Sequence, residues 1–155
     1  MSTHIPLIET GPFSPTGRDL LRALAGAVLP ADAGFGVPGA DDPEILAAAT
    51  ALLAPRAAEI EGALRHLDHL ADGGYATAPA ATRLALAETA LSTRAPGFGL
   101  LMTLLLQAYY QDDRVMQSLG MEPRPPFPLG YEVPEGDWSL LDPVRARPPF
   151  WRRAD

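Results

Sequence analysis

Two histidines and an aspartate are the residues whose spacing could bring metal ligands together. His66 and His69 are three residues apart, so they are neighbours on one face of a helix, and Asp72 follows about one turn later. Two imidazoles and a carboxylate can bind a transition metal. The spacing lacks the His-Glu-x-x-His pattern of zinc proteases, and His4 is the only other histidine. We expect a solvated role for these side chains, with a metal-binding protein as the alternative.

The other residue types that commonly perform catalysis form no recognisable site. No serine lies in a Gly-x-Ser-x-Gly elbow, and neither Gly-Phe-Gly sequence, at 34–36 and 97–99, completes a dinucleotide fingerprint. The adjacent aspartates Asp41-Asp42 and Asp112-Asp113 suit helix capping better than acid–base chemistry. We therefore expect no catalytic, cofactor-binding or metal-binding residues in this chain.

The composition excludes several other classes of function. All 12 basic residues are arginines and cysteine is absent, which rules out lysine Schiff bases, P-loop lysines, disulfides and thiolate metal sites. A net charge of −7 argues against nucleic acid as a partner, because phosphate binding needs a basic surface. The length of 155 residues fits a single domain with one core.

The apolar segments are too short for membrane insertion. The N-terminus has neither the basic start nor the long apolar run of a signal peptide. The most apolar stretch, Phe98 to Leu106, has about half the length that spans a bilayer. We expect no membrane span and a cytoplasmic protein, unless an exported partner carries it across a membrane.

Apolar residues at helical spacing predict two helical regions in the first half of the chain. A capping box at Thr16 to Asp19 predicts a helix from about Pro15 or Gly17 to Leu29. A turn-rich loop follows, and Asp42 then caps a helical region that ends near Ala71. Pro55 predicts a break within that region near Leu53, because proline removes a helix hydrogen bond.

Three further helices are predicted in the second half. One begins at Thr77 to Pro79 and continues to Leu91. The next, from Phe98 to Tyr109, is apolar nearly all round, which is typical of the central helix of a bundle. A short one follows from Arg114 to Leu119, with Gly120 in the left-handed closing position.

Together these patterns predict an all-α protein, a compact bundle of four to six helices with a long irregular Pro/aromatic-rich C-terminal tail. Its single domain would comprise an N-terminal arm (1–15), a helical core (16–120) and an extended tail (121–155).

The tail is the strongest candidate for a functional region. Its prolines forbid a continuous helix, yet its aromatic content is too high for a solvated coil. Aromatic anchors on an extended segment are typical of interface hot spots. The tail could therefore bind another protein, fold back on its own helices or cover a ligand pocket. Its aromatic residues are Phe127, Tyr131, Trp138, Phe150 and Trp151.

Four segments resemble the small subunit often called gluconate 2-dehydrogenase subunit 3. They are Leu24 to Asp32, Leu104 to Val115, Arg124 to Tyr131 and Asp137 to Val144. The resemblance implies a noncatalytic partner of a large flavin-dependent dehydrogenase of the glucose-methanol-choline superfamily, with FAD in that partner. Many such small subunits begin with a twin-arginine export signal, which the N-terminus of this sequence does not show.

We therefore expect an accessory subunit that is not itself an enzyme. It would bind and stabilise or mature the flavoprotein through its last helix and tail, with aromatic anchors and arginines that pair with carboxylates. The alternatives are a small metal-binding protein and a helical domain whose tail covers an apolar pocket. The expected partner-binding residues are Tyr110, Arg114, Arg124, Phe127, Tyr131, Trp138, Arg145, Arg147, Phe150 and Trp151.

Overall fold

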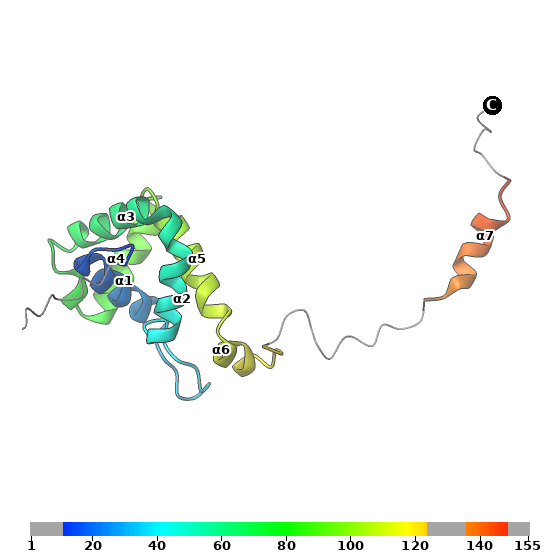
Figure 1. Cartoon of the computed structure of the whole chain (residues 1–155), viewed down its shortest axis with the longest axis horizontal. Helices are drawn as coiled ribbons and strands as arrows, with labels where there is room; N and C mark the ends of the chain where they lie inside the picture. The colour runs from blue at the N-terminus through cyan, green and yellow to red at the C-terminus, as the bar shows by residue number, and fades with distance from the viewer. Residues whose placement is uncertain (1–10, 124–135, 149–155) are drawn as a thin grey trace, which may run out of the picture. The chain divides into compact units, whose positions relative to one another are not determined.

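The computed structural model describes residues 11–123 and 136–148, and the chain divides into one unit up to Pro123 and a second from Arg124. The first unit is a helical bundle containing α1 to α6, and the second contains the short turn η3 and helix α7 (Figure 1). Apart from one isolated bridge, the described ranges contain no β-structure. This confirms the all-α prediction. None of the helices in these ranges is long and apolar enough to cross a membrane.

Helix α1 (Pro15–Val28) begins at Pro15, one of the two predicted starts, but its cap is not the predicted one. The cap is Ser14, whose Oγ accepts a hydrogen bond from the Gly17 N–H at 2.9 Å, so the capping box predicted at Thr16 to Asp19 is wrong. Pro15 occupies the first helical position, where its fixed φ favours the helix. The Glu61 carboxylate of α3 accepts a hydrogen bond from the Ser14 N–H at 2.7 Å. In a capping box the same bond goes to an acidic side chain of the capped helix itself, whereas here the acid comes from another helix.

The break at Pro55 is confirmed. Helix α2 (Pro43–Leu53) is followed by the 3₁₀ turn η1 (Ala54–Arg56) and then by α3 (Ala57–Leu70). The predicted cap of α2 is also confirmed, because the Asp42 carboxylate accepts the Glu44 N–H at 3.0 Å.

The rest of the bundle consists of η2 (Tyr75–Thr77), α4 (Ala80–Ser92), α5 (Phe98–Tyr110) and α6 (Asp113–Ser118). Helix α5 packs along α2, α1 packs against α4 and η2, and α3 contacts both α1 and α5. These elements enclose one apolar core. Its largest fully buried side chains are Tyr75, Phe98, Leu21, Leu24, Ile45, Leu53, Ile60, Leu64, Leu67, Leu101, Leu105 and Val115.

Helix α5 contacts α2, α3, α4 and α6, as predicted for a central helix, but one of its sides is exposed. Phe98, Leu101 and Leu105 lie in the core, whereas Leu104 and Leu106 are half-buried. A polar side of the helix is exposed at Thr103 and Gln107. The exposed side is polar, so the apolar positions of α5 pack against its neighbours and Thr103 and Gln107 stay in solvent among the described residues.

Candidate partner interface

Arg114 links two helix N-termini at one end of the bundle. Its Nε and Nη2 donate to the two carboxylate oxygens of Asp112, at 3.0 and 2.8 Å. Its Nη1 and Nη2 donate to those of Asp42, at 3.1 and 2.9 Å. Asp42 caps α2 and Asp112 caps α6, where it accepts the Arg114 N–H at 2.9 Å. One guanidinium therefore joins both caps with the paired geometry that suits arginine.

The pKa values of Asp42, Asp112 and Arg114, which together we call the Arg114 clamp, are shifted by the hydrogen bonds between them. Hydrogen bonds from Arg114 are the main cause that lowers the pKa of Asp42 and of Asp112 below the ordinary carboxyl value. The same bonds raise the pKa of Arg114. The predicted role of Arg114 as a contact to a partner stays a prediction, but in this structure its donors bind carboxylates of its own chain.

We expect Arg114→Met to destabilise the protein in a pH-dependent way. Because the folded-state pKa values of the two aspartates are lowered, the stabilisation is present above their ordinary value of about 3.9. It is lost as the pH falls through the lowered values. Thermal unfolding can be followed by circular dichroism from pH 7 to pH 2. The midpoint temperature of the wild type should exceed that of Arg114→Met at pH 7, and the difference should shrink in acid.

The matched control for this prediction is Arg65→Met, since Arg65 is exposed and pairs with Glu61 only at 3.7 Å. It should change the midpoint temperature little at any pH, because exposed pairs contribute little. If Arg114→Met lowered the midpoint temperature equally at pH 7 and pH 2, the effect would come from packing of the arginine stem and not from the ion pairs.

The loop between α1 and α2 presents Phe35 on a tight turn. Asp32 and Val37 exchange backbone hydrogen bonds at 3.1 and 3.0 Å, and the Asp32 carboxylate accepts the N–H groups of Gly34 and Phe35. Gly36 closes the turn with φ +65°. Phe35 is 76% exposed. The sequence predicts a loop here, and Phe35 is not among the expected contacts, although a phenylalanine between two glycines is a visible signal.

Exposed apolar side chains also surround α6. Tyr110, at the end of α5, is 52% exposed and makes an edge contact with the buried ring of Tyr109. Leu119 and Met121 follow α6 and are more than half exposed. Gly120 has φ +71°, and the Met121 N–H bonds the Met116 carbonyl at 3.0 Å. This confirms the predicted glycine closure, which fixes the backbone around both side chains.

The second unit holds a short capped helical segment where an irregular tail was predicted. Turn η3 (Trp138–Leu141) leads into α7 (Asp142–Arg145). The Asp137 carboxylate accepts hydrogen bonds from the Ser139 N–H and hydroxyl at 3.0 and 2.6 Å. These bonds are the main cause that lowers the pKa of Asp137. Asp137 therefore fixes the start of the segment.

The large apolar side chains of this segment are exposed. Trp138 is 64% and Leu140 is 73% exposed, and Leu141 and Val144 are also accessible. Arg145 makes an exposed pair with Asp142 at 3.5 Å, and Arg147 is exposed. Five of the predicted partner-binding residues lie outside the described residues, namely Arg124, Phe127, Tyr131, Phe150 and Trp151.

The histidines considered as metal ligands lie on the outside of α3. His66 and His69 are both exposed, as expected for a solvated role, and Asp72 follows the helix with φ 51°. Within residues 11–123 and 136–148, no group of three histidine, aspartate or glutamate side chains is arranged to hold a metal ion.

Comparisons with protein-family models, with curated proteins and with solved structures find no match to this chain. The described residues define a small all-α protein that has a helical bundle in its first unit and a short helical segment with exposed apolar side chains in its second.

Proposed function

We propose that the chain is a noncatalytic small subunit that binds, and stabilises or helps to mature, a large FAD-dependent sugar or alcohol dehydrogenase of the glucose-methanol-choline superfamily. The observation that carries the proposal is the capped segment from Trp138 to Arg145, which exposes a tryptophan and several aliphatic side chains. The resemblance of four sequence segments to gluconate 2-dehydrogenase subunit 3 supplies the class of partner. FAD belongs to that partner, and the cytoplasm is the proposed compartment.

The segment has the properties of a binding element. Its 3₁₀ turn and helix together hold eight residues, too few to bury a tryptophan among themselves. Burial of an aromatic side chain removes about 150–250 Å² from water, which is a large favourable contribution. The Asp137 cap reduces the ordering cost of binding, because part of the bound conformation is already formed. Arg145 and Arg147 at its end could then pair with carboxylates around a partner's groove.

The test is co-expression of this chain with a large flavin-dependent dehydrogenase of that superfamily from the same organism. A yellow complex should elute from gel filtration, and Trp138→Ala should weaken that complex about tenfold or more, as for a hot-spot aromatic. Leu91→Ala, a comparably exposed position on α4, is the matched control and should leave the affinity unchanged. If the intact chain elutes as a monomer beside the free flavoprotein, the proposed function is wrong.

A further inference from the structure

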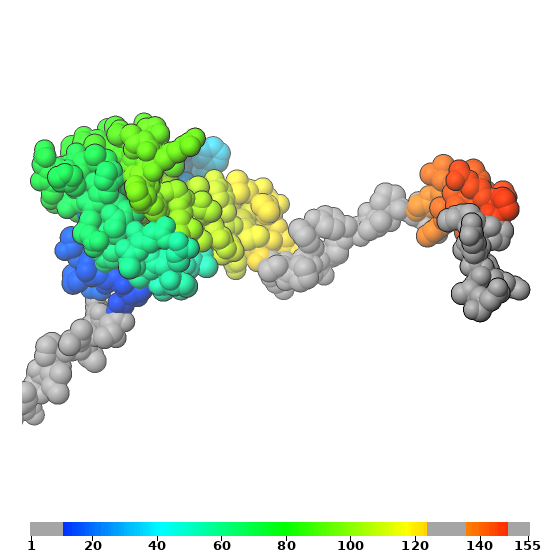
Figure 2. Space-filling model, turned by 90° about the horizontal axis from the view of Figure 1, so that it is seen from above, coloured from blue at the N-terminus to red at the C-terminus, as the bar shows by residue number. Residues whose placement is uncertain are grey.

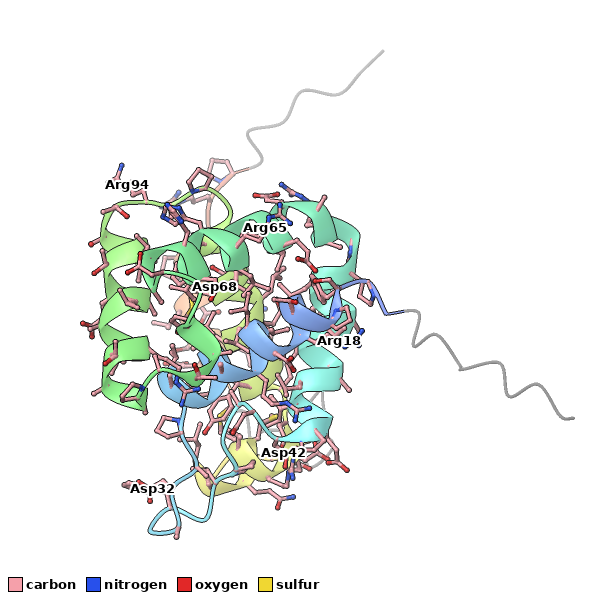
Figure 3. The ribbon with its side chains drawn as sticks, turned by 90° about the vertical axis from the view of Figure 1, so that its left-hand side faces the viewer. Arg18, Asp32, Asp42, Arg65, Asp68 and Arg94 are labelled. Carbon is pink, nitrogen blue, oxygen red and sulfur yellow. The ribbon has the colours of Figure 1, made fainter. Side chains whose placement is uncertain are left out.

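A second surface with the composition of an interface lies at one end of the bundle. The loop that carries Phe35 and helix α6 lie at this same end (Figures 1 and 3), and α6 is at the surface in Figure 2. The Asp42–Arg114 pair connects the two regions. Negative charge on Asp32 is also among the causes that raise the pKa of Tyr109, after burial, Tyr110 and Asp112. One end of the bundle therefore carries Phe35, Tyr110, Leu119 and Met121.

The charge of this end is one-sided. The stretches 29–48 and 106–123, both fully described, contain a single basic residue, Arg114, and its guanidinium is already shared between Asp42 and Asp112. Glu44 is 82% exposed along its side chain and reaches Arg114 only at 3.5 Å. Asp113, in the first turn of α6, is also exposed. Within these two stretches the acidic groups therefore outnumber the one arginine, although Arg22 and Arg83 from other elements line a hollow together with Asp41.

A shallow hollow lies between the start of α2 and the start of α6. Its volume is about 360 Å³, and Ile45, Ala48 and Ala108 contribute apolar walls. Glu44, Asp112, Asp113 and the ion-paired Arg114 line it as well. An arginine or lysine from another protein could lay its aliphatic stem along the apolar walls and place its charged head at the carboxylates.

We infer that this end of the bundle is a docking face for a protein surface that presents an apolar patch flanked by arginine or lysine side chains. The inference rests on the proposed function for the identity of the partner, and it assigns the first unit a contact in addition to the Trp138 segment. Apolar contacts supply affinity, whereas the acidic groups supply orientation and faster association. The Arg114 clamp holds α2 and α6 in fixed register, so the face is formed before binding.

The experiment measures the affinity of purified variants for the flavoprotein by biolayer interferometry at two salt concentrations. Tyr110→Ala and Glu44→Lys should each weaken binding about tenfold, and Glu44→Lys should also reduce the salt dependence. The matched controls are Leu91→Ala and Glu88→Lys, both exposed on α4, and they should bind like the intact chain. Phe35→Ala lies on a surface turn remote from the core and tests the face without a risk to folding.

The outcomes separate the two proposals. If the intact chain binds the flavoprotein and Tyr110→Ala, Glu44→Lys and Phe35→Ala bind as tightly as the controls, the docking face is refuted while the proposed function stands. If the intact chain does not bind at all, both fail. A homodimer of the purified chain that Tyr110→Ala dissociates would assign the face to a second copy and overturn the inferred partner.

Discussion

Tyr75→Ala is expected to lower the free energy of unfolding by about 3–5 kcal/mol, the range for truncation of a large buried side chain. Tyr75 is fully buried in η2, which packs against α1 and α3. Its hydroxyl donates to the Arg83 carbonyl at 3.1 Å, and Arg83 Nη1 donates to the Ala23 carbonyl at 2.9 Å. The variant would leave a cavity where the connection between α3 and α4 meets α1. Urea denaturation at pH 7 measures the change.

Tyr75→Phe separates the hydroxyl from the ring. The substitution should lower the free energy of unfolding by about 1 kcal/mol at pH 7, which is the usual contribution of one hydrogen bond. Burial raises the pKa of Tyr75 to about 12. An unfolded tyrosine ionises near pH 10, so the wild type loses stability as the pH rises from about 10 to 12, and the phenylalanine variant lacks this loss. Equal alkaline sensitivity of both proteins would show that other groups control it.

The helices were predictable where one residue decides the local backbone. Pro55 breaks the region between α2 and α3 whatever packs around it, because its ring removes a hydrogen bond. Asp42 and Gly120 likewise act within one turn of chain, as a cap and as a left-handed closure. Local chemistry of this kind is visible in the sequence alone.

Pro15, one of the two predicted starts, is the first residue of α1, but its cap was not predictable because the cap depends on a distant helix. Glu61 completes the hydrogen bonding of Ser14 from 47 residues away. Gly17 lacks a side chain at the position where a Cβ would overlap the Glu61 carboxylate. Thr16 to Asp19 matches the local capping pattern, but tertiary contacts favour the cap two residues earlier.

The candidate interface was predictable only in part. Tyr110 and Trp138 were expected as partner contacts, and both are exposed, while their contact with a partner stays a prediction. Phe35, Leu119 and Met121 were not among the expected contacts. An apolar residue in a loop becomes informative only once the structure shows it exposed among the described residues. The acidic hollow was equally invisible, since it joins side chains from α2 and α6.

Gly97→Ala is expected to lower the free energy of unfolding by about 2–3 kcal/mol. Gly97 begins α5 with φ +74°, a left-handed conformation that costs a residue with a Cβ about 1–2 kcal/mol. An added Cβ would also lie 2.9 Å from Cγ and 3.1 Å from the backbone oxygen of Glu59. That carbonyl belongs to α3 and cannot move away as a side chain would, so the close contact adds to the backbone strain.

Gly120→Ala isolates the strain from the contact, because Gly120 has φ +71° and no atom within 4 Å of the added Cβ. It should lower the free energy of unfolding only through the strain of the left-handed backbone, by about 1–2 kcal/mol. Urea denaturation of both variants therefore measures the contact between α5 and Glu59 as a difference. Equal losses would mean that α3 and α5 move apart enough to relieve the contact at no cost in free energy.

Gly97→Ala should also leave the affinity of the folded protein for its flavoprotein unchanged, since Gly97 and Tyr110 lie at opposite ends of α5.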